Sequence, residues 1–392
     1  MALIRDAGWL LAASAGSAPF ALAYSVLLAR WLDPADNGRV LTVTAAVATV
    51  ALLGQAGMVS ALIDAVRRDS VPAAVAWTRA ALWTALSLPI VSSPLLWLSG
   101  ESATVVALAA TTVIALCALQ LAQAVARATD RFHVASATSV ALSVGKVAAL
   151  TGVVLGVSPS VAWALGSTLV ATAAVAVYAS WGLAPAWPGP LSASVRMLRF
   201  AGGSFLWTAT ALLHERLDLL LLAWLTGNPT EVAVYGVALA VAQRIRVVPL
   251  ALGGAVHPHL AVLAPDEAFA QSKAPLRLAA VWLALTSVSL AVLSPLALPW
   301  LWGAPYAAAV PLVWVLLPGV AASAVTVLLG RVYQALDRQA VNVIAQGTST
   351  VLGVAMALYL VPEWGALGAA IASTAASGIG LAVVGFAWLR FR

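Results

Sequence analysis

Twelve stretches of about twenty apolar residues follow one another along this chain, and they decide what it can fold into. A helix needs about 20 apolar residues to cross a bilayer, so each stretch predicts one span. The spans are expected at 7–29, 40–63, 73–98, 103–126, 134–156, 160–183, 200–226, 232–256, 278–302, 306–330, 340–361 and 365–389. The longest connection, 257–277, is too short for a further domain. The sequence therefore predicts an all-α integral membrane protein.

The composition excludes the main soluble classes. Hydrophobic residues make up 62% of the chain and charged residues only 9%, whereas a soluble domain has about 25% charged residues. This excludes a soluble enzyme, a nucleic-acid-binding protein and a disordered regulator. The single cysteine, Cys117, excludes a disulfide within one chain and a cysteine-cluster metal site.

The loop charges predict the orientation. Thirteen Lys and Arg residues lie in the two terminal tails and in the second, fourth, sixth, eighth and tenth loops, and only Arg30 and Arg39 lie in the other loops. Cytoplasmic loops carry the excess of Lys and Arg, so both termini are expected in the cytoplasm. A cleaved signal ending at Ala21-Leu22-Ala23 is the alternative, but it leaves eleven spans and violates the charge bias.

A proline-rich segment divides the spans six and six. Residues 184–199 contain three prolines within six positions, which break a helix. We expect an N-terminal lobe at 1–183, a cytoplasmic linker at 184–199 and a C-terminal lobe at 200–392. Ala128 to Arg131 resembles Ala335 to Arg338, and Ala164 to Thr172 resembles Ala366 to Thr374. The two offsets nearly agree, which indicates a repeat of six spans and the architecture of a transporter.

Five cations fall inside the predicted spans. They are Arg79, Lys146, Arg216, Arg244 and Arg246. A charge at the centre of a bilayer costs about 2.5–3.5 kcal/mol on insertion scales, so such residues usually face a cavity or a partner. Lys146 lies roughly 18 Å into its span at about 1.5 Å per residue. It is expected to face a cavity, with a packing role beside an acid as the alternative. Arg79 lies near its span end, and snorkelling to the surface is its alternative.

Two acids lie in the seventh span, opposite the arginines of the eighth. Glu215 and Asp218 are three residues apart and share a helix face. A turn near residue 229 or 230 brings Glu215 and Arg244 to the same depth, so a structural ion pair between them is one interpretation. Arg244 and Arg246 lie about 200° apart and cannot face the same way. The sequence does not decide which of them faces a cavity.

The cations of the spans outnumber the acids by three. A lumen with this surplus attracts anions, and Arg and Lys are the residues that hold phosphate. We therefore expect an anionic, phosphate-bearing substrate, held by Lys146, Arg216, Arg244 and Arg246, with Arg79 at the inner mouth. Glu215 and Asp218 are candidates for orienting these cations and for carrying a coupling proton.

No cofactor or metal is expected. The chain lacks a nucleotide-binding P-loop motif, and its four histidines have no metal-type spacing with carboxylates. An enzymatic alternative rests on Asp33 and Asp36 in the first outer loop, where multi-span glycosyltransferases often place acids. The competing interpretation is a turn in which Asp33-Pro34 begins a helix.

Several segments resemble the polysaccharide-export flippases of the multidrug/oligosaccharidyl-lipid/polysaccharide exporter superfamily. The similar segments are Asp218 to Gly227 with Glu231 to Ala240, Leu28 to Gly38, Val361 to Ala372 and Ala335 to Arg338. The resemblance implies two six-helix lobes around a V-shaped central cavity and alternating access. It also implies a polyprenyl-pyrophosphate-linked oligosaccharide as the substrate, moved from the inner to the outer leaflet.

The expected function is thus a lipid-linked oligosaccharide flippase of the cytoplasmic membrane, without catalytic residues. Its partners are the lipid-linked substrate and the bilayer, and polysaccharide assembly proteins are candidates; nucleic acid is not expected. A cation-coupled multidrug exporter of the same superfamily is the first alternative. Drug exporters commonly use an acid in the first helix, and span 7–29 has none. A membrane glycosyltransferase is the second alternative.

Overall fold

The computed structural model describes residues 2–67, 69–97, 100–181, 183, 191–260, 263, 265–336 and 338–390. Within the helices of these ranges, some side chains are not described, namely those of residues 2–11, 13–14, 91–97, 191–194, 203–204, 206–216, 254–259, 265 and 339. Helices make up almost all of the described part, which contains no strand. The all-α prediction is confirmed.

The helices account for the twelve predicted spans. Eight of them, among the described residues, are long and apolar enough to cross a membrane. One of these, α13 (Gln339–Arg390), is two helices joined at Gly365, whose backbone is not helical. Three further long helices are α1 (Ala2–Trp31), α4 (Ala73–Trp97) and α8 (Leu191–Thr226). Counting α13 twice and adding these three gives twelve spans, so the chain is a multi-pass membrane protein.

The chain forms two compact units, which divide within α8. The N-terminal unit is Ala12–Leu212, and the C-terminal unit is Leu213–Arg392 with Met1–Leu11. The predicted lobes at 1–183 and 200–392, with a linker at 184–199, stay a prediction, because residues 184–190 lie outside the described part.

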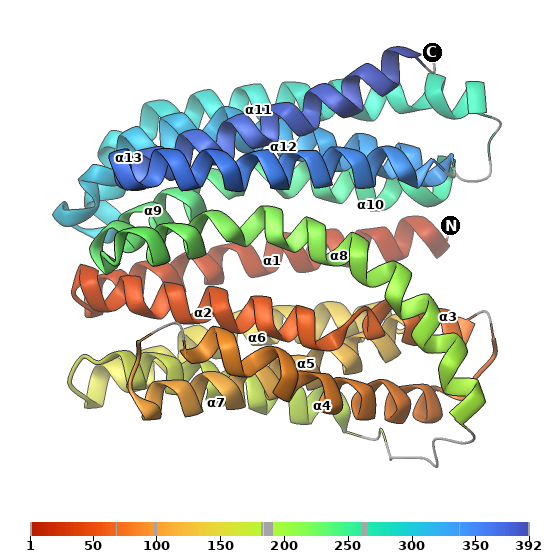
Figure 1. The fold of residues 1–392 in the computed structure, drawn as a ribbon, viewed down its shortest axis with the longest axis horizontal. Coiled ribbons are helices and arrows are strands. Elements are labelled where there is room, and N and C mark those ends of the chain that lie inside the picture. The colour runs from red at the N-terminus through yellow and green to blue at the C-terminus, as the bar shows by residue number, and fades with distance from the viewer. Residues whose placement is uncertain are drawn as a thin grey trace. The chain divides into compact units, whose positions relative to one another are not determined.

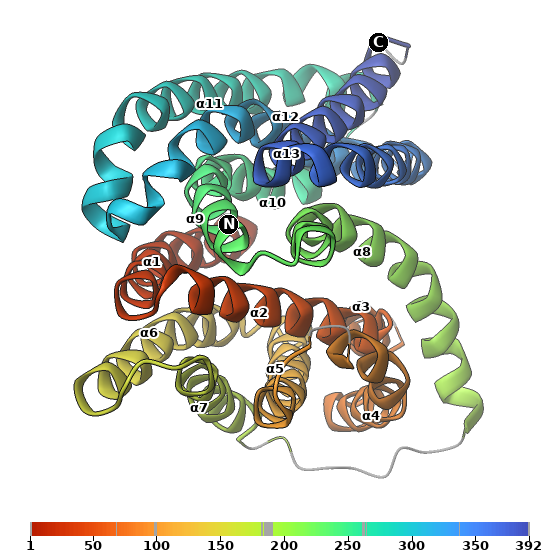
Figure 2. The same cartoon turned by 60° about the vertical axis from the view of Figure 1, so that its left-hand side comes forward.

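In the N-terminal unit, α5 (Ala103–Ala128) is the central helix. It packs against α2 (Pro34–Gln55), α3 (Met58–Arg67), α4, α6 (Phe132–Gly156) and α7 (Val161–Ser180). Figure 2 shows α5 with α7 on one side and α4 on the other. Two apolar clusters are built on it, one towards α2 and α7 and one towards α3 and α4. Ser102 and Ser160 begin α5 and α7 by accepting a hydrogen bond from the third backbone N–H that follows.

The predicted span 40–63 is not one helix. It contains most of α2 and the first part of α3. A turn at Ala56–Gly57, where both residues have positive φ, separates the two helices. A side chain at Gly57 would place its Cβ 2.2 Å from the carbonyl oxygen of Ala201 on α8. The apolar pattern continues through the turn, so hydropathy alone does not show the break.

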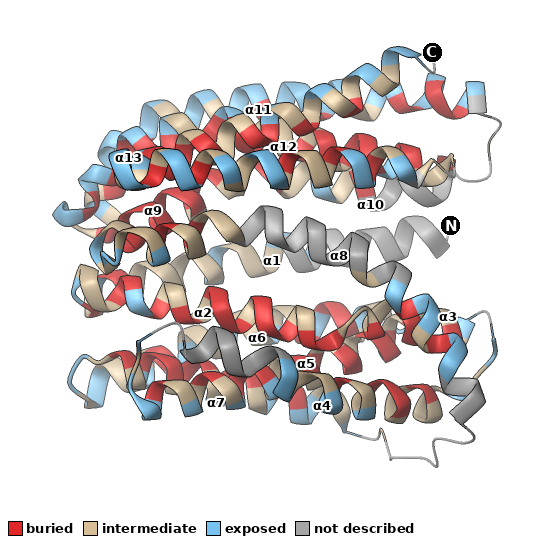
Figure 3. Ribbon diagram, viewed as in Figure 1, coloured by how far each residue is buried: buried red, intermediate tan, exposed pale blue. Residues whose placement is uncertain are grey.

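In the C-terminal unit, α12 (Ala309–Ala335) is the central helix. It packs against α9 (Pro229–Ala242), α10 (Val247–Leu260), α11 (Pro265–Trp302) and α13 (Figure 1). Figure 3 shows α12 buried over much of its length. Gly319 lets α13 approach closely, because a Cβ there would lie 2.6 Å from Thr374. The short 3₁₀ helices η1 (Gln243–Arg246) and η2 (Ala304–Ala308) precede α10 and α12. Helix α11 begins at Pro265 and continues directly into the ninth predicted span.

A side chain of α9 stabilises the break in α13. Gly365 has φ +52°, and the Glu231 carboxylate accepts a hydrogen bond from the backbone N–H of Ala366 at 3.1 Å. Asn228 donates to the same carboxylate at 3.1 Å. Glu231 therefore caps the last helix of the chain, since the first N–H groups of a helix lack partners within it.

Candidate functional site

A tight hairpin of α8 and α9 positions the central side chain of the site. Helix α8 ends at Thr226, Gly227 has φ +59°, and the Asn228 side chain accepts from Thr230 N at the start of α9. The turn therefore lies within two residues of its predicted place. The hairpin brings Asp218 of α8 and Tyr235 of α9 to nearly the same depth, where their side chains meet.

Asp218 joins three helices. Its carboxylate accepts a hydrogen bond from the Tyr235 hydroxyl of α9 at 2.5 Å and one from the Ser373 hydroxyl of α13 at 3.2 Å. Tyr235 is fully buried. Hydrogen bonds to an ionised acceptor are about twice as strong as neutral ones. The two hydroxyls therefore stabilise a negative charge within the packed helices.

Arg246 faces the same cavity as Asp218. This cavity, the Arg246 cavity, has a volume of about 30 Å³, enough for about one water. Its wall consists of Asp218, Leu239, Gln243, Arg246, Leu316, Gly319, Val320, Ser323, Ser373, Thr374 and Ser377. Arg246 is buried, with 8% of its surface exposed. A buried cation, a carboxylate and four hydroxyl side chains thus meet at one polar site inside the C-terminal unit.

The 3₁₀ helix η1 separates the two arginines of the eighth span. Arg246 lines the Arg246 cavity, whereas Arg244 is half-buried and is not part of its wall. A 3₁₀ helix turns by about 120° per residue, so residues two apart cannot face the same way. Of the two arginines, only Arg246 therefore lines a cavity described in this structure. A 3₁₀ stretch inside a span often marks a hinge.

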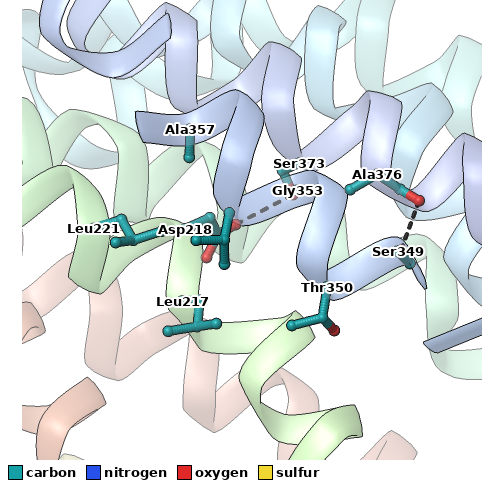
Figure 4. A pocket seen from close by; sticks show the side chains of 10 residues that line it. Leu217, Asp218, Leu221, Ser349, Thr350, Gly353, Ala357, Ser373 and Ala376 are labelled. Atoms are coloured by element: carbon teal, nitrogen blue, oxygen red, sulfur yellow. Dashed lines mark hydrogen bonds between the residues drawn. The ribbon is translucent and has the colours of Figure 1, made fainter. Parts of the chain in front are cut away.

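A second small cavity lies on the other side of Asp218, between α8 and α13 (Figure 4). This Ser349 cavity also has a volume of about 30 Å³. Its wall consists of Leu217, Asp218, Leu221, Ser349, Thr350, Gly353, Val354, Ala357, Ser373 and Ala376. In Figure 4, Ser349 donates to the backbone oxygen of Ala376, at 2.6 Å, and ties the two halves of α13 together. Asp218 and Ser373 therefore form the partition between two cavities.

The structure brings only part of the predicted set together. Asp218 and Arg246 share a cavity. The side chains of Glu215 and Arg216 lie outside the described residues, so the predicted pairing of Glu215 with Arg244 stays a prediction. Lys146 lies half-buried on α6 of the N-terminal unit, and Arg79 lies on α4 of the same unit with 7% of its surface exposed.

The two acids of the glycosyltransferase alternative lie at a helix start. Asp33 is the residue before α2, with Pro34 in the first helical position. Asp36 lies in the first turn and forms an exposed ion pair with Arg39, at 3.6 Å. The expected helix start is therefore present, although the Asp33 side chain makes no capping hydrogen bond.

Sequence reasoning did not single out Tyr235, Ser373 or Gln243. The hairpin register contains part of the signal for Tyr235, because its distance from the turn differs from that of Asp218 by only two residues. Ser373 is 155 residues from Asp218, and only the folded chain shows that the last helix returns to the seventh.

Comparison with known families shows to which protein family the chain belongs. The family model described as "Polysaccharide biosynthesis protein" matches residues 27–311, well over half of the chain. The chain belongs to the polysaccharide biosynthesis protein family. No curated protein matches this chain.

The fold resembles those of solved membrane transporters. The lipid II flippase MurJ, in an inward closed conformation, aligns with TM-score 0.74 at 12% identity, over 97% of this chain and 88% of that one. An inward-facing multidrug resistance MATE family transporter of the MOP superfamily aligns with TM-score 0.75 at 14% identity, over 96% and 95%. The Vibrio cholerae MATE transporter VcmN aligns with TM-score 0.62 at 15% identity, over 99% and 96%. Family and fold together support a membrane flippase or transporter of the MOP superfamily.

Proposed function

We propose that this chain is a flippase for a polyprenyl-pyrophosphate-linked oligosaccharide, a precursor of a polysaccharide. It moves the head group through a cationic lumen by alternating access, from the inner to the outer leaflet of the cytoplasmic membrane. Both termini lie in the cytoplasm. It transports its substrate and catalyses no chemical step.

The main observation in support of this proposal is the position of Arg246. A buried guanidinium within a membrane span is costly unless it has a partner or a polar cavity, and Arg246 lines a cavity with Asp218 and several hydroxyls. Arginine binds phosphate through two parallel hydrogen bonds. In a polysaccharide biosynthesis family, a pyrophosphate-linked sugar is the anion that fits this chemistry.

The other cations of the spans extend the path. Lys146, Arg216 and Arg244 hold the pyrophosphate or acidic sugars at successive stages, and Arg79 lies at the inner mouth. Asp218 and Glu215 orient the cations and are the sites at which a coupling proton would bind. Asp218 suits the orienting role because the hydroxyls of Tyr235 and Ser373 fix its carboxylate.

A multidrug exporter is the second candidate. The similarity of the fold to MATE transporters favours it, and so does Asp218, since an intramembrane acid attracts cations. The two functions demand opposite charge in the lumen. A flippase for pyrophosphate lipids needs cations there, whereas a cationic drug needs acids.

The test is transport in proteoliposomes that contain the full chain. One set follows leaflet exchange of a fluorescent polyprenyl-pyrophosphate oligosaccharide, and a second set follows ethidium uptake under a proton gradient. We expect at least a tenfold acceleration of lipid exchange over empty liposomes and no ethidium transport. The reverse result would establish the second candidate. A double variant, Asp33→Ala with Asp36→Ala, should retain lipid exchange; loss of exchange in this folded variant would reopen the glycosyltransferase alternative.

A further inference from the structure

A third cavity, larger than the two in the C-terminal unit, lies in the N-terminal unit. It has a volume of about 230 Å³, which corresponds to about seven waters at about 30 Å³ each. Its wall consists of Leu52, Gln55, Gly57, Val59, Ser60, Gln120, Gln123 and Arg127. None of the residues expected to hold phosphate belongs to this wall. We call it the amide cavity, because three glutamines dominate its polar surface.

The break between α2 and α3 opens onto the amide cavity. Gly57 belongs to both the break and the wall. The break lies ten residues before the end of α3 at Arg67, about 15 Å at about 1.5 Å per residue, which is near the middle of a bilayer. Non-helical backbone at this depth is tolerated where it is buried in protein or lines a polar cavity. Broken helices of this kind are typical of substrate sites in transporters.

Helix α5 presents a polar stripe to the amide cavity. Gln120, Gln123 and Arg127 are spaced three and four residues apart and therefore share one face. The side chain of Gln55, at the end of α2, donates a hydrogen bond to the side-chain oxygen of Gln120 at 2.6 Å. Gln123 donates to the hydroxyls of Thr138 and Ser139 on α6 at 3.1 and 3.3 Å. Within the described part of the chain, these bonds do not use the Gln120 side-chain nitrogen or the Gln123 side-chain oxygen. One donor and one acceptor are therefore available to a ligand.

Arg127 adds one cation at the end of the stripe. Its backbone oxygen accepts from Arg67 at 2.7 Å. Among the described residues, its buried Nε has no hydrogen-bond partner. A buried donor of this kind costs free energy unless a ligand or water satisfies it.

We propose that the amide cavity binds one sugar ring of the transported glycan. This inference rests on the proposed function and names the part of the substrate that the N-terminal unit recognises. Sugar hydroxyls both donate and accept hydrogen bonds, as glutamine amides do. Leu52 and Val59 offer an apolar wall to the face of the ring, and Arg127 binds a ring hydroxyl or a carboxylate. The volume fits a single ring, and the single cation distinguishes the site from a pyrophosphate site.

The direct test measures sugar binding without transport. The full chain is reconstituted in lipid nanodiscs, and saturation-transfer NMR is recorded with N-acetylglucosamine, galactose and glucuronate. We expect a signal with at least one of the three sugars in the wild type, reduced at least tenfold in Gln120→Leu with Gln123→Leu. Arg127→Gln is a second variant, which leaves both glutamines in place. Gln346→Leu, in a span of the other unit, is the matched control and should bind as the wild type does.

A parallel exchange assay compares two lipids, bare polyprenyl pyrophosphate and polyprenyl-pyrophosphate oligosaccharide. The double glutamine variant should slow exchange of the oligosaccharide lipid at least tenfold and leave the bare lipid unchanged. No signal with any sugar in the wild type, or equal signals in wild type and folded double variant, would overturn the inference. Sugar binding without any lipid exchange would instead refute the proposed function and leave the sugar site standing.

Discussion

The two units enclose their polar groups in contrasting ways. In the C-terminal unit, Asp218 and Arg246 line cavities of about 30 Å³, and hydroxyls from α9 and α13 hold the carboxylate in place. In the N-terminal unit, neutral amides line a cavity of about 230 Å³. Buried charge requires close partners, whereas neutral amides tolerate open space. The comparison supports the two proposals, charge recognition at the first site and hydroxyl recognition at the second.

The largest expected effect lies in the cap that holds the last helix of the C-terminal unit. Gly365→Ala would place a Cβ 2.2 Å from the Glu231 carboxylate, at a residue with φ +52°. We expect a loss of about 2–4 kcal/mol in stability, since strained backbone costs about 1–3 kcal/mol and displacing the Glu231 cap costs about 0.5–2 kcal/mol. Thermal unfolding of the purified chain in detergent measures it. Gly347→Ala, with no atom within 4 Å of the new Cβ, is the control. Equal melting temperatures for the two variants would contradict the close contact.

The next effect tests whether the Asp218 site is as tightly bonded as described. Asp218→Leu removes the acceptor of the buried Tyr235 hydroxyl, and leaving such a group unsatisfied costs about 1–3 kcal/mol. The same substitution should cost less in a Tyr235→Phe background, because no hydroxyl then loses its acceptor. A double-mutant cycle of unfolding free energies measures the coupling. Strictly additive effects would mean that the hydrogen bond contributes nothing.

A matched pair of substitutions compares the two cavities directly. Ser323→Leu adds bulk to the Arg246 cavity, and overpacking of so small a site costs about 1–3 kcal/mol. Ser60→Leu adds the same bulk to the amide cavity, where we expect a cost of less than about 1 kcal/mol because the cavity is larger. Melting temperatures of both variants check this. A larger loss for Ser60→Leu than for Ser323→Leu would reverse the comparison.

The smallest effect is expected at the exposed charges of the N-terminal unit. Asp69 accepts from Arg196 at 3.3 Å, and the Arg196 side chain is 78% exposed. Surface ion pairs contribute about 0–1 kcal/mol and are screened by salt. Asp69→Asn should therefore lower stability by at most about 1 kcal/mol, and less in high salt. A salt-independent loss larger than this would show that the pair is structural.

Hydropathy was sufficient to predict the helices of this fold. The twelve spans follow from the apolar runs, and the hairpin of α8 and α9 follows from Gly227, Asn228 and Pro229. The break at Ala56–Gly57 was missed because small apolar residues continue through it. Its reason is tertiary, namely the approach of α8 to Gly57.

The site was only partly predictable. Intramembrane charge identified Asp218 and Arg246, since their cost requires a function or a partner. The preference for Arg246 over Arg244 depends on the 3₁₀ geometry of η1, which local sequence does not specify. Ser373 lies too far along the chain for any spacing argument. The stripe of Gln120, Gln123 and Arg127 has a readable helical period, but its importance becomes visible only with the cavity beside it.

The most direct test of the cationic path is leaflet exchange with Arg246 varied alone. Proteoliposomes with wild type, Arg246→Lys and Arg246→Gln are compared on the polyprenyl-pyrophosphate oligosaccharide, with folding of each variant checked by gel filtration. We expect Arg246→Gln to slow exchange at least tenfold and Arg246→Lys to retain more of it, because the charge remains while the two-pronged contact is lost. Exchange at the wild-type rate in folded Arg246→Gln would contradict a role for this cation in carrying the head group.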